Sequence, residues 1–91
     1  MDFENLKIGM KESISKTITE TDIILYSGIS LDCNPVHLNK EYAEASRFKK
    51  RIAHGMLTAG LISAVLGTKL PGEGTIYLEQ NLKFKQPVYL G

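Results

Sequence analysis

The sequence contains one cysteine, no tryptophan and no excess of charge of either sign. A single thiol, Cys33, excludes an internal disulfide and is typical of a reducing compartment, so we expect a cytoplasmic protein. Eleven Lys and Arg residues against ten Asp and Glu residues give a net charge of +1. This balance argues against nucleic acid as a partner.

A long apolar run and a secretory leader are also missing. The longest apolar stretch, residues 56–66, is too short to span a membrane and is interrupted by Thr58, Gly60 and Ser63. Residues 1–5 are acidic and lack the positive start and apolar run of a secretory signal. We therefore expect no membrane association. The length allows one domain, residues 1–91.

Propensity and capping signals predict a strand followed by two short helices. Residues 10–19 are rich in β-branched side chains, which favour a strand. A helix is expected from Asp22 to about Ser30, capped by Thr19 or Thr21 and ended by Asn34-Pro35. A second short helix is expected over residues 39–47, capped by Asn39.

The next two segments have the clearest periodicity in the chain. Apolar residues cover nearly the whole circumference of a helix over residues 55–67, so we expect a fully buried helix. Residues 76–85 alternate between apolar and polar, which predicts a strand with one buried face. This order indicates a sheet wrapped around the helix. Two strands cannot wrap it, so we expect the chain to associate rather than remain a stable monomer.

The segment Asp32-Cys33-Asn34-Pro35-Val36-His37 holds the first chemical motif. An arbitrary Asp and His at this spacing are more often structural than catalytic. Here Pro35 stiffens the turn, and Asn34 can hydrogen-bond the local backbone, so the carboxylate and imidazole are expected to converge. A converging Asp32 and His37 could carry out general acid–base chemistry.

The second motif begins the buried helix. The Gly55 amide, at the positive end of the helix dipole, could hold a carbonyl oxygen that gains negative charge. The alternative is that Gly55 only permits a close approach of the backbone. We expect His54 to be a helix cap or packing residue rather than a catalyst, and Ser63 to bond back to the preceding turn.

Other reactive groups fit less well. Cys33 is disfavoured as a nucleophile, because neighbouring turn residues point in different directions. We expect no metal and no cofactor, since Asp32, Cys33, His37 and His54 show no paired ligand motif. A basic cluster is typical of a solvated face, although it could also meet the phosphates of a cofactor-like substrate; it comprises Lys40, Lys49, Lys50 and Arg51.

Taken together, D-x-N-P-x-H at 32–37 and I-A-H-G-M-L at 52–57 resemble the MaoC-like (R)-specific enoyl-CoA hydratases of the hotdog superfamily. Residues 70–77 (L-P-G-x-G-x-I-Y) and 84–88 (F-x-x-P-V) agree with this resemblance, which covers essentially the whole chain. It implies an α+β hotdog fold, with an antiparallel sheet wrapped around a long central helix. It also implies reversible addition of water to trans-2-enoyl-CoA, giving the (R)-3-hydroxyacyl-CoA.

The resemblance implies that Asp32 and His37 activate the water and that the Gly55 amide polarises the thioester carbonyl. Asn34 and Ser63 are implied as further substrate-binding residues. Which of Asp32 and His37 takes the first proton stays open. Members of the family continue with further strands, so we expect the C-terminal strands to be missing here. A homo-oligomer or a complementing chain would then supply them.

Two alternatives remain besides a hydratase. A non-catalytic or remnant hotdog partner subunit would fit a shortened sheet. A hotdog acyl thioesterase fits less well, because thioesterases and acyl-carrier-protein dehydratases of this fold resemble one another in placing an acidic residue on the central helix. Residues 55–68 contain no Asp or Glu. Acyl chain length, and CoA against acyl-carrier protein, are not determined by these residues.

Overall fold

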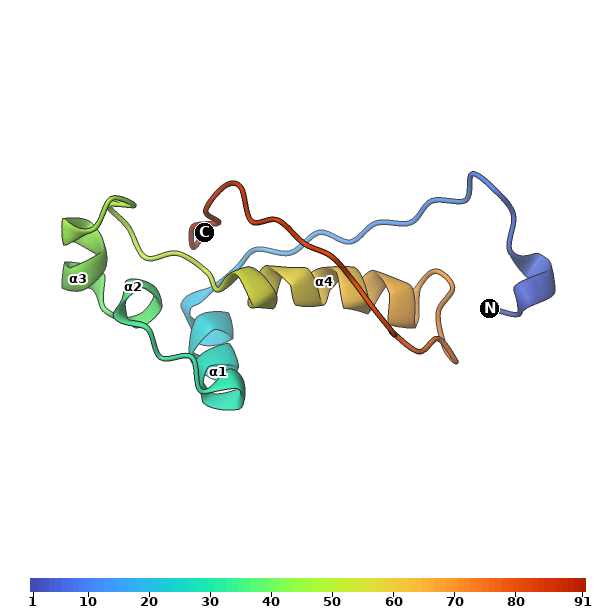
Figure 1. Cartoon of the computed structure of the whole chain (residues 1–91), viewed down its shortest axis with the longest axis horizontal. Coiled ribbons are helices and arrows are strands. Elements are labelled where there is room, and N and C mark those ends of the chain that lie inside the picture. The colour runs from blue at the N-terminus through green and yellow to red at the C-terminus, as the bar shows by residue number, and fades with distance from the viewer.

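The computed structural model describes residues 1–91 and is helical, without a paired sheet. Its elements are η1 (Phe3–Asn5), α1 (Glu20–Ser30), α2 (Pro35–Leu38), α3 (Lys40–Ala45) and α4 (Gly55–Thr68). The molecule is elongated, with extents of 52 × 24 × 22 Å. Helix α4 lies along the long axis, while α1, α2 and α3 gather at one end (Figure 1). None of the helices has the length and apolar character that a membrane crossing would need.

Helix α1 begins with a capping box, which confirms the helix predicted over residues 22–30 and selects Thr19 as its cap. The Asp22 N–H donates to Thr19 Oγ1 at 3.2 Å, and the Thr19 N–H donates back to Asp22 Oδ2 at 2.9 Å. The Thr19 N–H and then the Lys16 ammonium, 3.0 Å away, lower the pKa of Asp22. The helix ends where Leu31 adopts a left-handed conformation.

Asparagine residues begin the next two helices. Asn34 Oδ1 accepts the Val36 N–H at 3.1 Å to start α2, in which Pro35 takes the first position. Asn39 Oδ1 accepts the Tyr42 N–H at 3.0 Å to start α3, as its predicted cap requires. Helix α3 stops at Ala45, before the predicted end at residue 47, because Ser46 is extended.

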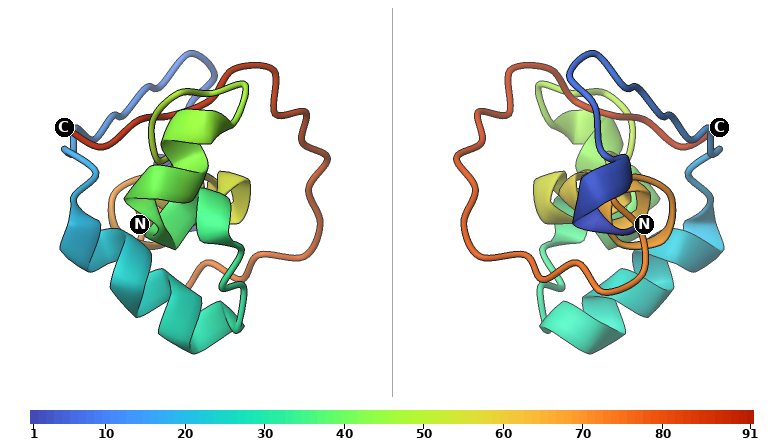
Figure 2. Two further views of the ribbon diagram at one scale, coloured as in Figure 1. Left: turned by 90° about the vertical axis from the view of Figure 1, so that its left-hand side faces the viewer. Right: turned by 90° about the vertical axis from the view of Figure 1, so that its right-hand side faces the viewer.

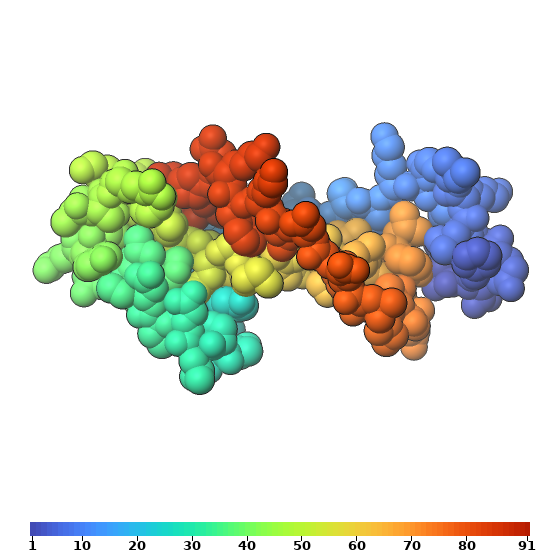
Figure 3. Space-filling model, viewed as in Figure 1, coloured from blue at the N-terminus to red at the C-terminus, as the bar shows by residue number.

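Helix α4 matches the predicted range, but the prediction that it is fully buried is wrong. None of its residues is buried, and Met56 and Ile62 are 57% and 44% exposed. The small core lies near the start of α4, where Ile18, Ile23 and Ala53 pack together with Leu57 and Leu61. The rest of α4 lacks the sheet that would cover it, so part of its apolar surface meets solvent. In Figure 3 the segment after α4 crosses over the helix and covers only part of it.

The two predicted strands are extended but unpaired, so the predicted antiparallel sheet does not form within this chain. No backbone–backbone hydrogen bond involves residues 76–87. Residues 10–19 and 76–85 run on different sides of α4, which keeps their backbones apart (Figure 2). A period-two pattern shows which face a strand would bury, but a strand also needs a neighbouring backbone within hydrogen-bonding distance.

The last four residues make the backbone contacts that most resemble strand pairing. The Ala53 N–H donates to the Val88 carbonyl at 2.7 Å, next to an antiparallel bridge between Ile52 and Tyr89. The Gly91 N–H donates to the Ile18 carbonyl at 3.0 Å. These bonds hold residues 88–91 between the end of the first extended segment and the residues that precede α4.

Candidate active site

Asp32 and His37 flank a turn that the local side chains hold together. Asp32 Oδ1 accepts the Asn34 N–H at 3.3 Å, and Asn34 Oδ1 accepts the Val36 N–H at 3.1 Å. These two bonds confirm that Asn34 orders the turn. The Asn34 side-chain oxygen is therefore engaged with the backbone, and its NH2 group is the part left for a ligand.

The orientation of His37 is set by a long-range hydrogen bond. Its ring is buried, and Nδ1 lies 2.8 Å from the carbonyl oxygen of Ile52. Because a carbonyl can only accept, Nδ1 carries the proton in this contact. In the neutral ring the lone pair is then on Nε2, which can accept a proton.

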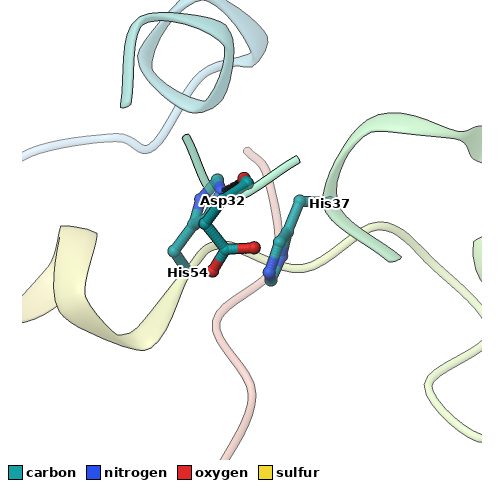
Figure 4. Close-up of side chains that lie close together, drawn as sticks. All are labelled: Asp32, His37 and His54. Carbon is teal, nitrogen blue, oxygen red and sulfur yellow. Dashed lines mark hydrogen bonds between the residues drawn. The ribbon is translucent and has the colours of Figure 1, made fainter. Parts of the chain in front are cut away.

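The structure brings the Asp32 and His37 side chains together, as the turn predicts. A carboxylate oxygen of Asp32, a ring nitrogen of His37 and a ring nitrogen of His54 all lie within 4.8 Å of one another. In Figure 4 the Asp32 carboxylate points toward the His37 ring. Asp32 is exposed and His37 is buried, so the pair lies at the boundary between solvent and the interior of the protein.

His54 completes this group and was expected only as a cap or packing residue. It occupies the N-cap position of α4, as expected, although its side chain makes no capping bond. The ring is 2% exposed and stacks on His37, with centroids 3.9 Å apart and planes 27° apart. Its Nδ1 is buried without a hydrogen-bond partner, at a cost of about 1–3 kcal/mol.

The stacking of the two imidazoles bears on metal binding. Histidine ligates a metal through a lone pair in the plane of its ring, and stacked rings direct these lone pairs along nearly parallel planes. In addition, His37 Nδ1 and His54 Nε2 face carbonyl oxygens at 2.8 and 2.9 Å. These contacts leave His37 Nε2 and His54 Nδ1 as the ring nitrogens available to an ion shared with Asp32.

The start of α4 offers two free backbone donors. The Leu57 and Thr58 N–H groups both donate to the His54 carbonyl, at 3.1 and 3.3 Å, whereas the Gly55 and Met56 N–H groups make no hydrogen bond. Free amides at a helix N-terminus favour an anion or a polarised carbonyl oxygen. Gly55 and His37 line the same cavity, of about 220 Å³.

Packing also favours glycine at position 55. A Cβ added to Gly55 would lie 3.0 Å from the ring of Phe84, which is too close for an ordinary contact. This confirms the alternative explanation for Gly55, namely that glycine permits a close approach to the backbone at the start of the helix. It leaves the Gly55 N–H free as a donor, so packing and carbonyl binding are compatible.

Ser63 does not share the cavity of His37. It lies on the exposed side of α4 and lines a neighbouring, mostly apolar hollow of about 480 Å³. Phe84 lines both cavities and so lies between them. The hydrogen bond expected from Ser63 to the preceding turn is absent, whereas Thr58 and Thr68 make such bonds at 2.7 and 2.6 Å.

The basic cluster forms a separate hollow of about 210 Å³. Its lining residues are Lys40, Glu44, Lys49, Lys50, Arg51, Tyr89 and Leu90. The Arg51 guanidinium donates to Glu20 at 2.7 Å, and the Lys50 ammonium lies 5.7 Å from the centre of the Tyr89 ring. The hollow therefore combines positive charge with an aromatic wall. Cys33 is exposed and lies outside it.

Sequence reasoning missed the long-range contacts around the site. The Ile52 carbonyl, the Ser27 hydroxyl and the His54 ring contact partners 15, 27 and 22 positions away. Motif spacing and periodicity report on neighbours within a few residues, so they carried no signal for these contacts.

Comparison with known proteins relates the whole chain to one family. Residues 3–91 match the model of the MaoC like domain. An (R)-specific enoyl-CoA hydratase of Rhodospirillum rubrum is 60% identical over 89 residues, which cover 98% of this chain and 62% of that protein. A 3-hydroxybutyryl-CoA dehydratase of Methylorubrum extorquens is 48% identical, over 98% of this chain and 57% of that protein.

Solved structures of (R)-hydratases with the hotdog fold share the backbone. The unliganded R-hydratase PhaJ1 from Pseudomonas aeruginosa matches with a TM-score of 0.91 and 51% identity, over 97% of this chain and 57% of that one. The (R)-hydratase from Aeromonas caviae involved in PHA biosynthesis matches with a TM-score of 0.94 and 42% identity, over 97% and 67%. The chain spans about three fifths of the length of these two curated relatives. It belongs to the MaoC-like domain family.

Proposed function

We propose that the protein carrying this chain is an (R)-specific enoyl-CoA hydratase, which adds water reversibly to trans-2-enoyl-CoA and gives the (R)-3-hydroxyacyl-CoA. The observation that most supports this proposal is that a carboxylate oxygen of Asp32 and a ring nitrogen of His37 lie within 4.8 Å of each other. His37 also shares a cavity with Gly55. The names of the relatives, (R)-specific enoyl-CoA hydratase and 3-hydroxybutyryl-CoA dehydratase, describe the same class of reaction.

In this proposal Asp32 and His37 bind one water molecule between them. The ionised carboxylate accepts one hydrogen bond from the water, and the unprotonated Nε2 of His37 accepts the other. His37 takes the proton as the water oxygen bonds to C3 of the enoyl group. The imidazolium then returns the proton to C2. The net change is the addition of one water, and His37 ends in its starting state.

The start of α4 would hold the negative charge that forms during this addition. As oxygen bonds to C3, the electron pair of the double bond moves toward the thioester oxygen. The free N–H of Gly55, at the positive end of α4, is the proposed donor to that oxygen. The Met56 N–H, which also makes no bond within the chain, is available beside it.

Three further features would bind the rest of the substrate. The apolar hollow that contains Ser63 suits an acyl chain, and the NH2 group of Asn34 can reach a ligand at the mouth of the turn. The hollow lined by Lys40, Lys49, Lys50 and Arg51 suits the phosphates of the CoA moiety. A carrier-protein thioester would present phosphate on an acidic protein, so this hollow is compatible with either carrier.

The exposed apolar surface suggests how the fold is completed. We propose that residues 10–19 and 76–85 become strands of a hotdog sheet when further polypeptide, from a second copy or a complementing chain, pairs with them. Their unpaired backbone groups and the exposed side chains of Ile14, Ile76 and Leu78 support this proposal. The low cysteine content supports a cytoplasmic location.

The stereochemistry of the product tests the proposed function. The protein is incubated with crotonyl-CoA, and the 3-hydroxybutyryl-CoA formed is separated into its enantiomers. The proposal expects the (R) product. Formation of the (S) product, or thioester hydrolysis in place of hydration, would contradict it.

A further inference from the structure

The proposed chemistry makes no direct use of His54, yet this buried ring contacts both proposed catalytic residues. Its Nε2 lies 2.9 Å from the backbone carbonyl oxygen of Asp32 and 3.1 Å from the Ser27 hydroxyl. Its face stacks on the His37 ring at a centroid distance of 3.9 Å. The ring of Tyr26 contacts it as well, with centroids 4.8 Å apart and planes tilted by 59°. One side chain thus joins α1, the Asp32 turn and α2.

The contact with Asp32 places a proton on the His54 ring. A carbonyl oxygen only accepts, so Nε2 is the donor. Nδ1 is buried and has no partner. A side chain retained for packing alone would be better as an apolar ring, which has no buried nitrogen to satisfy. The Nε2–H bond to Asp32 is therefore what the imidazole adds.

The backbone of the same residue belongs to the helix start. The His54 carbonyl accepts the N–H groups of Leu57 and Thr58 and so forms the first turn of α4. Gly55, with its free N–H, is the next residue. His37 is bound to the Ile52 carbonyl, two residues before His54. Residues 52–55 therefore contact His37, the Asp32 turn and the amide that would bind the thioester oxygen.

We propose that His54 is a positioning residue for the hydration reaction. Its N–H fixes the Asp32 turn, and its face fixes the His37 ring, so both side chains keep a set distance from the Gly55 amide. The ring itself does not touch the reacting atoms. In its kinetic part this inference rests on the proposed hydratase function.

Two variants separate the donor of His54 from its ring. His54→Phe keeps a flat ring against His37 but removes the N–H, whereas His54→Gln keeps an N–H donor near the position of Nε2 but removes the ring. We expect His54→Phe to lower kcat for crotonyl-CoA by up to about 10²-fold, as a misplaced catalytic group does, with little change in KM. His54→Gln should recover part of that loss.

Ser27→Ala is the matched control. It removes the second contact of His54 Nε2 and leaves the bond to Asp32 in place. We expect its kcat to equal that of the parent, because Ser27 has no part in the reaction. A kcat loss in Ser27→Ala as large as that in His54→Phe would overturn the proposal, since any change of packing around His54 would then have the same effect.

A spectroscopic readout keeps the test independent of activity. The ¹⁵N resonances of the His37 ring report its tautomer and its surroundings. They should shift in His54→Phe and His54→Gln but not in Ser27→Ala. If the parent shows no hydration, the proposed function fails, and these resonances still decide whether His54 sets the state of His37.

Two results would overturn the inference. The first is a parent-like kcat with unshifted His37 resonances in His54→Phe. The second is a kcat in His54→Gln no higher than in His54→Phe, because the donor would then contribute nothing. If His54→Phe does not fold, His54→Gln alone tests the inference. A lowered kcat together with shifted His37 resonances in His54→Gln supports the inference, whereas a parent-like kcat with unshifted resonances overturns it.

Discussion

The Nδ1–H of His37 donates to the carbonyl oxygen of Ile52 at 2.8 Å, across fifteen residues of sequence. This bond fixes which nitrogen of the ring holds the proton and leaves Nε2 as an acceptor, in a ring of which one nitrogen lies within 4.8 Å of an Asp32 carboxylate oxygen. The tautomer of His37, in a turn that is local in sequence, is thus set by the segment that leads into α4.

Gly55 should not tolerate a side chain. In Gly55→Ala the new Cβ would lie 3.0 Å from the Phe84 ring, so either the ring or the helix start must move. We expect a lower melting temperature and a lower rate of crotonyl-CoA hydration, because the proposed carbonyl donor would move as well. Thermal unfolding and steady-state kinetics measure the two effects.

Gly60→Ala is the matched control for that change. Gly60 also lies in α4, but no atom lies within 4 Å of the position of its added Cβ. Alanine at this helix interior position should stabilise the protein by about 0.5–1 kcal/mol. A loss of stability in Gly60→Ala equal to that in Gly55→Ala would show that the Phe84 contact is not the cause.

The capping box of α1 should make stability depend on acid pH. The pKa of Asp22 is lowered in the folded state by the Thr19 N–H and by Lys16. A lowered carboxyl pKa contributes stability that is present above the unfolded value, 3.8, and is lost as pH falls through the folded pKa. Asp22→Asn should flatten this part of the stability curve, as measured by denaturant unfolding at several pH values.

Thr19→Ala tests the other half of the capping box. It removes the hydroxyl that accepts the Asp22 N–H, and we expect a loss of about 1 kcal/mol. Thr21→Ala serves as the control, since Thr21 was an alternative cap and makes no side-chain hydrogen bond in the structure. Equal losses in the two variants would mean that Thr19 has no special role.

Cys33 and bound metal should be dispensable for activity. Cys33 is exposed, and its thiol has only a long contact, 3.9 Å, to the Ser27 carbonyl. We expect Cys33→Ser to hydrate crotonyl-CoA at the parent rate, and a chelator to have no effect. Loss of turnover in Cys33→Ser, with turnover retained in Asp32→Asn, would replace acid–base hydration by thiol chemistry.

Helices α1, α3 and α4 and the turn from Asp32 to His37 were predictable because their signals are local, whereas the short helix α2 was not predicted. Thr19, Asn34 and Asn39 bond to N–H groups two or three residues away, and Pro35 sits at a first helical position, so short sequence windows contain the information. The convergence of Asp32 and His37 follows from the same turn.

The sheet, the burial of α4 and the orienting contacts were not predictable in this way. The alternation over residues 76–85 describes one face of a strand, but pairing depends on a second backbone that this chain does not bring alongside. Burial of α4 depends on that same sheet. The contacts of His54 with Asp32 and Ser27 join positions 22 and 27 residues apart, beyond any local pattern.

Association should accompany the exposed apolar surface. Met56, Ile76, Leu78 and Phe84 are 57%, 77%, 91% and 57% exposed, and large apolar surfaces of this kind mark interfaces. We expect sedimentation at micromolar concentration to show a dimer or a larger assembly. A monomer that melts cooperatively would contradict the proposed completion of the sheet by further polypeptide.

The most direct test of the central claim is the rate of crotonyl-CoA hydration in Asp32→Asn and His37→Ala, with Glu41→Gln as a control carboxylate in α3. If Asp32 holds the water and His37 transfers its proton, each of the first two variants should lose about 10²–10⁴-fold in kcat, while Glu41→Gln keeps the parent rate. Parent-like hydration in Asp32→Asn or His37→Ala would contradict the account.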